Sequence, residues 1–179
     1  MRVLIVPASR HGGTAEIGRA MATSLRQRGF DVDVSQPEHM FDLSPYGAAI
    51  LGSGLYLGDW LGPAKAFVED HSVGLRRIPC WLFSSGPLGA AAPKEPVNPE
   101  VIERLIEQAG AEEHRLFGGR LEVDRLGRTE RFIARWVGAE DGDYRPWDEI
   151  EVWVGSIADA LRQADADGDT SADADVDVG

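Results

Sequence analysis

The sequence predicts a doubly wound α/β fold, with five parallel strands and helices on both faces of one sheet. The order expected for these strands is 2-1-3-4-5, one of the two common orders of doubly wound sheets. Three observations predict this fold. Short apolar runs alternate with helical patterns, the connections between runs are long enough for right-handed crossovers, and glycine-rich loops follow the first, third and fourth runs. The 179 residues, 43% of them hydrophobic, suit one compact domain with a full core.

The first half of the chain contains three of the strands. The run 3–6 is typical of a strand buried on both faces, and residues 30–34 alternate as an edge strand does. Between them a helix is predicted, because apolar side chains recur at helical spacing and a glycine follows them; these residues are Ile17, Met21, Leu25 and Gly29. Residues 48–51 form the third predicted strand, and Pro63 marks the first turn of the next helix.

The second half repeats the alternation. Residues 78–83 and 114–117 predict the fourth and fifth strands, and Asn98-Pro99 is a strong signal for a helix start between them. The last predicted helix carries the apolar residues Ile150, Trp153, Val154, Ile157 and Leu161. Between the fifth strand and this helix lie roughly 30 residues, too many for a plain loop, and they predict an inserted amphipathic helix.

Charge and cysteine content limit the partners and the compartment. The formal net charge is −12, and residues 164–179 hold six Asp and no cation, so a domain is predicted over 1–162 and an acidic, disordered tail over 163–179. The acidic balance argues against nucleic acid as a partner, because nucleic-acid binders need a cationic face. The single cysteine, Cys80, and the absence of a signal peptide or long apolar run predict a cytoplasmic protein with at most peripheral contact at the inner face of the cell membrane. No metal site is expected, because His71 and His114 lack metal-ligand spacing with each other or with a carboxylate cluster.

Three loops lie where a doubly wound sheet binds its ligands, beyond the carboxyl ends of the strands. They are residues 9–14 ("SRHGGT"), 52–58 and 84–89. In the first loop, glycines permit close backbone approach, and hydroxyls and a helix N-terminus favour a phosphate; an ordinary capped turn is the alternative. No Lys-Ser/Thr follows the glycines, so hydrolysis of nucleoside triphosphates is not expected, and residues 52–54 do not match the dinucleotide fingerprint.

The first loop resembles the FMN phosphate loop of flavodoxins, whose pattern is a hydroxyl, a variable pair, glycine, a variable residue and threonine. Most of residues 1–162 are similar to the flavodoxin-like branch that contains menaquinone-dependent protoporphyrinogen IX dehydrogenase. The similarity rests on residues 52–58 with Tyr56, Phe67-Val68, Pro79 before Ser84-Ser85, residues 117–121, and residues 138–143 ahead of Trp147. The chain departs from the branch at His11 and Gly13 in the phosphate loop, and at 88–92, which lacks the basic and polar side chains of the bacterial haem enzyme.

The resemblance implies a flavodoxin-like fold and FMN bound without a covalent bond. The implied cofactor-binding residues are Ser9, Arg10, His11, Gly12, Gly13 and Thr14 at the phosphate, Ser53, Gly54, Leu55, Tyr56 and Leu57 on one side of the flavin ring, Ser84, Ser85, Gly86, Pro87 and Leu88 on the other, and Gly119 at its edge. Tyr56 or Trp60 is a candidate to stack on the ring, and a core aromatic is the alternative for each.

The predicted function is an FMN-dependent oxidoreductase that passes electrons from a reduced organic substrate to a quinone-type acceptor. Protoporphyrinogen IX is one hypothesis for the substrate, and Arg120, Arg128 and Arg131 are weaker candidates to receive its anionic groups; a solvated helix face is their alternative. The alternative function is a flavodoxin-like electron carrier that binds a redox protein through an acidic face. A third is a phosphate-loop scaffold without a cofactor. No catalytic acid or base is assigned, and the oligomeric state stays open.

Overall fold

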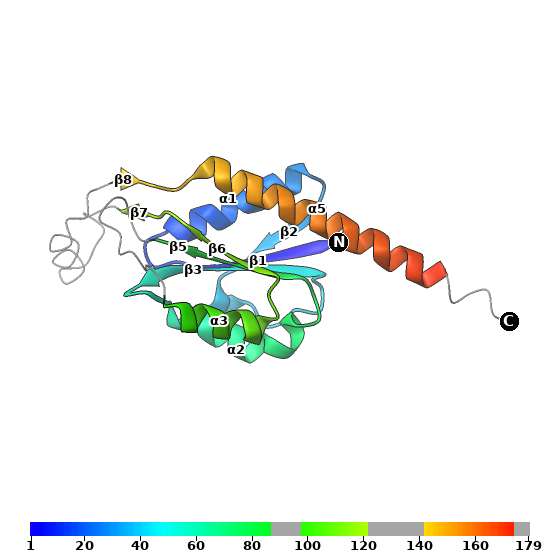
Figure 1. Ribbon diagram of the computed structural model, residues 1–179, viewed down its shortest axis with the longest axis horizontal. Coiled ribbons are helices and arrows are strands. Elements are labelled where there is room, and N and C mark those ends of the chain that lie inside the picture. Colours follow the sequence, from blue (N-terminus) through cyan, green and yellow to red (C-terminus); the bar gives the residue numbers. More distant parts are fainter. Residues whose placement is uncertain (87–97, 122–141, 174–179) are drawn as a thin grey trace.

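A parallel sheet in the order β2-β1-β3-β5-β6 forms the middle layer of the computed structural model, which describes residues 1–86, 98–121 and 142–173 (Figure 1). The strands are β1 (Arg2–Ala8), β2 (Asp31–Val34), β3 (Ala48–Tyr56), β5 (Cys80–Ser85) and β6 (Glu113–Phe117). All four pairings between them are parallel. The predicted fold class and strand order are therefore confirmed.

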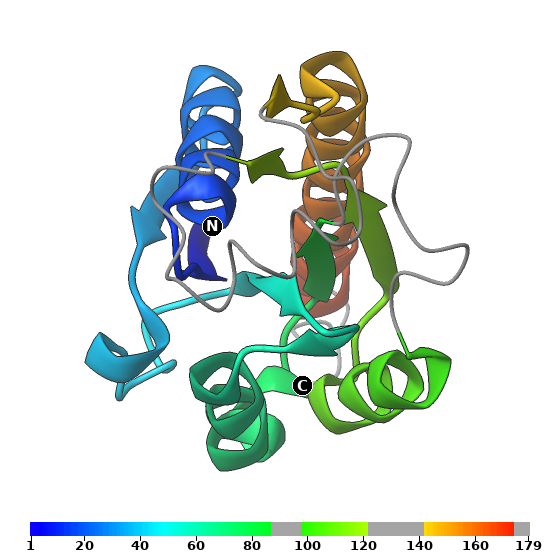
Figure 2. The same cartoon turned by 90° about the vertical axis from the view of Figure 1, so that its left-hand side faces the viewer.

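Two pairs of helices cover the sheet. Helices α1 (Gly13–Gln27) and α5 (Trp147–Asp173) lie on one face, and α2 (Gly62–Leu75) and α3 (Pro99–Ala109) lie on the other (Figures 1 and 2). A short 3-10 helix, η1 (Pro37–His39), follows β2. Each helix begins close to where the sequence predicts it, and Asn98 caps α3 by accepting a hydrogen bond from the backbone N–H of Glu100 at 3.1 Å.

The alternation of side chains along each strand divides the core in two. In β1, Val3 and Ile5 pack with α1 and α5, while Leu4 and Val6 pack with α2 and α3. All four are buried. The continuous apolar run in this strand is therefore explained by a sheet that is covered on both faces.

Two strands extend further than the sequence predicts. Strand β3 continues through residues 52–56, and β5 includes Ser84 and Ser85, which were both expected in loops. The backbone ladder between these strands continues to the pair Gly54 and Ser85. Strand ends depend on whether a neighbouring strand offers hydrogen bonds, so glycine and serine at these positions did not end the strands.

A tight hairpin follows β3. Strand β4 (Asp59–Trp60) pairs antiparallel with the end of β3, and Leu57 and Gly58 form the turn. Both turn residues have positive φ, +52° and +79°. A two-residue hairpin turn of this kind requires a left-handed backbone at both positions, and leucine at the first of them is unfavourable.

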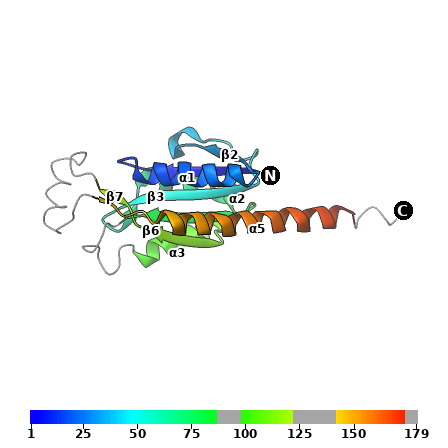
Figure 3. The same cartoon turned by 90° about the horizontal axis from the view of Figure 1, so that it is seen from above.

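The region between β6 and α5 begins and ends in a short antiparallel pair, β7 (Arg120–Leu121) with β8 (Gly142–Asp143). The inserted helix predicted between them falls on 122–141, outside the described residues. Helix α5 continues to Asp173 and extends past the sheet, so it includes residues 163–173, where the sequence predicts disorder (Figure 3). The division into a domain and a tail stays a prediction.

Candidate functional site

The loop after β1 ends at an uncapped helix N-terminus. Gly12 is the N-cap of α1 with φ of +89°, and as a glycine it offers no side chain to cap the helix. The first N–H groups of a helix have no partner within the helix, and they carry the positive end of its dipole. A Cβ atom added to Gly12 would meet no atom within 4 Å, so there is open space beside the loop. The predicted residues Ser9, Arg10, His11 and Gly13 lie in or next to this loop and are half-buried or exposed.

Thr14 joins this loop to the ends of two other strands. Its hydroxyl and that of Ser85 lie 2.7 Å apart, and both side chains are buried. A Cβ atom at Gly54 would lie 3.1 Å from the Thr14 hydroxyl. The structure therefore brings together the three loops that the sequence analysis selected, at the carboxyl ends of β1, β3 and β5 (Figure 2).

Ser53 and Ser84, by contrast, point to the opposite side of the sheet. The Ser53 hydroxyl accepts a hydrogen bond from the backbone N–H of Leu61 at 3.0 Å, and the Ser84 hydroxyl accepts one from the indole N–H of Trp60 at 2.8 Å. Both serines are fully buried. Successive side chains of a strand alternate between its faces, so Ser84 and Ser85 cannot serve the same side.

Trp60 belongs to the core. It is 3% exposed and its indole N–H donates a hydrogen bond to Ser84, so Trp60 is a core aromatic and not a ring exposed to a ligand. Tyr56 is 37% exposed, and the guanidinium of Arg10 lies 4.6 Å from the centre of its ring. Leu57, beside it, is 79% exposed, and Leu55 is half-buried. The exposed aromatic ring next to residues 9–14 is therefore Tyr56, which can stack on a flat ligand.

A half-buried histidine completes the Ser84 contacts. His114 Nε2 lies 2.9 Å from the Ser84 hydroxyl, and burial lowers the pKa of His114 to about 4. The imidazole is therefore neutral at pH 7. Because Trp60 donates to Ser84, the serine's own proton is available for Nε2 of the histidine. This network lies in the α2 and α3 layer, where it satisfies buried polar groups.

The remaining predicted residues lie at the edge of the site. The N–H of Gly86 donates to the carbonyl of Phe117 at 3.0 Å, and the carbonyl of Gly119 accepts from the N–H of Tyr144 at 3.0 Å. Arg120 contacts Glu16, as described next. Four predicted residues lie outside the described part of the chain: Pro87, Leu88, Arg128 and Arg131.

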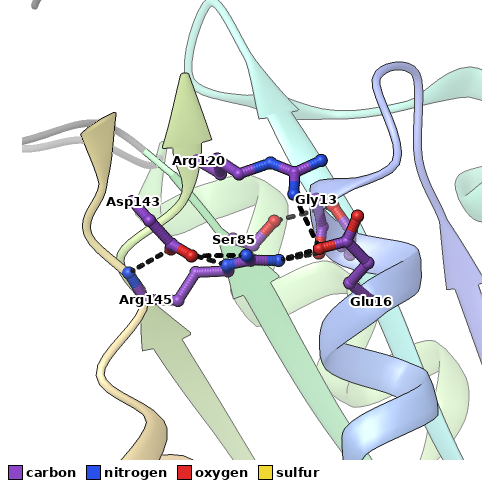
Figure 4. Close-up of polar contacts among 7 residues, drawn as sticks. Gly13, Glu16, Ser85, Arg120, Asp143 and Arg145 are labelled. Carbon is purple, nitrogen blue, oxygen red and sulfur yellow. Dashed lines mark hydrogen bonds and ion pairs between the residues drawn. The ribbon is translucent and has the colours of Figure 1, made fainter. Parts of the chain in front are cut away.

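An ion-pair network connects the first turn of α1 to β7 and β8 (Figure 4). Glu16 Oε2 lies 2.7 Å from Arg145 Nη1 and 2.9 Å from Arg120 Nη1. Arg145 also donates to Asp143 from Nε at 2.7 Å and from Nη2 at 2.5 Å, and its guanidinium lies 4.5 Å from the ring centre of Trp147. Hydrogen bonds from Arg145 lower the pKa of both Glu16 and Asp143, so both carboxylates are ionised at neutral pH.

The sequence analysis assigned no role to Glu16, Asp143 or Arg145. The contact between Glu16 and Arg145 spans 129 positions, so no local pattern reveals it. One signal was available: an acidic residue in the first turn of a helix expected to bind phosphate would repel that phosphate, so a nearby cation could be expected.

The flavodoxin domain family matches residues 4–146. The chain belongs to this family. The curated flavodoxin-like relative "Protoporphyrinogen IX dehydrogenase [quinone]" of Escherichia coli strain K12 is 20% identical over 172 residues, which cover 88% of this chain and 95% of the relative. Family membership supports a role in electron transfer or oxidoreduction, and the site just described lies within the matched residues or directly beside them.

Solved flavodoxin structures agree in fold. The flavodoxin of Streptococcus pneumoniae TIGR4 matches with a TM-score of 0.58 at 21% identity, over 92% of this chain and 99% of that one. The rubredoxin oxygen:oxidoreductase of Desulfovibrio gigas matches with a TM-score of 0.60 at 16% identity, over 90% of this chain. This chain covers only 36% of the length of that larger protein. At these identities the likeness shows the fold alone.

In the residues that the structure describes, no helix is both long enough and apolar enough to cross a membrane.

Proposed function

We propose that this protein binds FMN without a covalent bond and acts as an oxidoreductase. The observation that carries the proposal is the junction of three strand ends around Thr14 and Ser85, directly beside an uncapped helix N-terminus. Helix N-termini of this kind bind phosphate groups. The flavodoxin relatives support the same cofactor.

The residues at the junction fit FMN. Open space beside Gly12 leaves room for a phosphate, and the left-handed backbone there turns the chain into the helix. The hydrogen bond between the Thr14 and Ser85 hydroxyls fixes the first turn of α1 to the end of β5. Tyr56 presents an exposed ring from the neighbouring strand. The loop at Gly12 can therefore accommodate a phosphate group, and Tyr56 can contact a flat ring system.

When bound, the flavin ring supplies the transfer of one or two electrons or of a hydride. The chain's own residues bind and orient the ring. Tyr56 would stack on the ring, and the buried ends of β3 and β5 would keep water from it. Among the described residues near the junction, Glu16 and Asp143 are both held by arginines, so neither is assigned as a proton donor or acceptor.

The proposed reaction oxidises a reduced organic substrate and passes its electrons to a quinone-type acceptor. Support comes from the curated relative, whose name gives protoporphyrinogen IX and a quinone. A second observation is that a long stretch of sequence separates β7 from β8, whose paired strands are joined to α1 by the ion pairs that Arg120 and Arg145 make with Glu16. A minimal electron carrier has no need of such a region.

Titration of the purified protein with FMN, followed by visible absorption spectra, tests the cofactor. Anaerobic photoreduction and mixing with a water-soluble menaquinone analogue then test the reaction. We expect rapid two-electron reoxidation by the quinone, and slower oxidation of the reduced protein by ferricytochrome c. A long-lived one-electron-reduced state without quinone reactivity favours the electron carrier instead, and a protein that binds no flavin contradicts both functions.

A further inference from the structure

A carboxylate occupies the first turn of α1, the helix whose N-terminus ends the proposed phosphate loop. Glu16 donates its backbone N–H to the carbonyl of Gly12 at 2.9 Å, one helical turn away. The helix dipole attracts an anion to this end, whereas a nearby carboxylate repels it. The side chain of Glu16 is 33% exposed, so bulk water screens it only in part. Glu16 therefore opposes a bound phosphate unless its charge is neutralised.

Two guanidinium groups meet this carboxylate at one oxygen. Arg145 and Arg120 each place a nitrogen within 3 Å of Glu16 Oε2 (Figure 4). The side chain of Arg145 is only 4% exposed. Two hydrogen bonds to Asp143 and the ring of Trp147 fix its orientation. Arg145 is thus a rigid cation that faces Glu16 from the connection between β8 and α5.

Arg145 also touches the helix end itself. Its Nη1 atom lies 3.4 Å from the carbonyl oxygen of Gly13, the first residue of α1. The guanidinium therefore fixes both the backbone of the first helical turn and the carboxylate that projects from it. The network as a whole adds no net charge to the site, because the carboxylates of Glu16 and Asp143 are matched by the guanidinium groups of Arg145 and Arg120.

We infer that Arg145 is a positioning residue that sets the preference of this site for a phosphorylated over an unphosphorylated flavin, by neutralising Glu16. The inference rests on the proposed function, because it places the ligand's phosphate at residues 9–14. Selection of the phosphate then depends on a residue far from the phosphate loop in sequence. Arg145 acts through Glu16, and riboflavin, which has no phosphate, is indifferent to it.

The test is the ratio of dissociation constants for riboflavin and FMN, measured by quenching of flavin fluorescence. In Arg145→Gln the carboxylate of Glu16 loses one of its two cations, and we expect FMN to bind at least about tenfold more weakly. Riboflavin affinity is expected to change less than about twofold. The double variant Glu16→Gln/Arg145→Gln is expected to regain FMN affinity to within about threefold of the wild type, since the two charges that remain, on Asp143 and Arg120, again sum to zero.

Arg28→Gln is the matched control, because Arg28 joins the other end of α1 to Glu151 of α5 by an ion pair of 2.8 Å. It should leave the ratio unchanged. If Arg145→Gln does not fold, Arg120→Gln and its double variant with Glu16→Gln give the same measurement with the same expectations. A ratio that stays at the wild-type value, or a double variant that regains nothing, overturns the inference. Wild-type protein that binds neither flavin contradicts the proposed function instead.

Discussion

The hydroxyls of Thr14 and Ser85 lie 2.7 Å apart in the buried centre of the site, although 71 positions separate them. This hydrogen bond joins the first turn of α1 to the last residue of β5. It fixes the start of the helix relative to the sheet, and with it the orientation of the N–H groups that we propose to bind phosphate. Both residues were predicted in the cofactor site from sequence, and their direct contact was not.

Removing the Thr14 hydroxyl should destabilise the fold. In Thr14→Val the shape is kept, but the buried Ser85 hydroxyl loses its partner, which costs about 1–3 kcal/mol of the free energy of unfolding. Urea denaturation of the apoprotein measures this free energy. Thr14→Ser keeps the hydroxyl and should lose less of the free energy of unfolding. Equal stability of the valine and serine variants would show that the hydrogen bond contributes nothing.

The strained turn at Leu57 gives a stabilising substitution. Leucine with a φ of +52° is unfavourable by about 1 kcal/mol, whereas asparagine tolerates this backbone and Asn-Gly is a preferred pair for such hairpins. The leucine side chain is 79% exposed, so little packing is lost. We therefore expect Leu57→Asn to raise the free energy of unfolding by about 1 kcal/mol.

The comparison variant for this turn is Leu57→Val. Valine is equally apolar, but its branched Cβ fits the left-handed region worse than leucine does, so it should lower the melting temperature. Thermal unfolding, monitored by circular dichroism, distinguishes the asparagine variant from the valine variant. An asparagine variant no more stable than the valine variant contradicts the role given to backbone strain.

His114 should make stability depend on pH. Its pKa is about 4 in the folded state and near 6.5 in the unfolded state, so the unfolded chain binds an extra proton between these values. The contribution of the neutral imidazole is fully present above pH 6.5 and is lost as the pH falls towards 4. His114→Gln, whose amide oxygen can still accept from Ser84, should lack this loss.

Urea unfolding at pH 7.5 and pH 4.5 measures the difference. Between these values the wild type should lose on the order of 2 kcal/mol more than His114→Gln, because each pKa unit corresponds to about 1.4 kcal/mol. Carboxylates that titrate over the same range cancel in the comparison. An equal loss of unfolding free energy in the two proteins would mean that His114 is not desolvated as described.

Gly118 has no room for a side chain. A Cβ atom there would lie 2.1 Å from the carbonyl oxygen of Tyr144, the residue before Arg145. Gly118→Ala must therefore move the backbone that carries Arg145, and we expect a loss of at least about 2 kcal/mol in unfolding free energy. Gly62→Ala, where a Cβ meets nothing within 4 Å, should be nearly neutral. Similar losses in both variants would argue against this close contact.

The alternation of strands and helices and the positions of the three loops could be predicted, because apolar periodicity and the positions of glycine are local properties. The strand order is not local, and its prediction came from the resemblance to flavodoxins. The limits of β3 and β5 could not be predicted, since they depend on pairing between strands. The same limit applies to Ser53 and Ser84, whose direction follows from the strand register rather than from residue type. In a run without polar alternation, nothing in the sequence tells which serine faces the site.

Trp60 and Arg145 illustrate the two kinds of error that remain. The aromatic ring of Trp60 was a candidate to stack on the flavin, but its N–H donates to the buried hydroxyl of Ser84 in β5. Arg145 was not considered, because its partners Glu16 and Gly13 lie at the other end of the chain. Both depend on tertiary contacts, which periodicity and motif spacing do not encode.

The central claim, that residues 9–14 bind the phosphate of FMN, is tested most directly at Gly12. Aspartate and asparagine have nearly the same shape, both tolerate the left-handed backbone, and the space beside Gly12 is open, so Gly12→Asp and Gly12→Asn differ chiefly in charge. The measurement is the dissociation constant of FMN and of riboflavin for each variant. We predict that FMN binds at least about tenfold more weakly to the aspartate variant than to the asparagine variant, while riboflavin binds both equally. Equal FMN affinity in the two variants would contradict a phosphate at this loop.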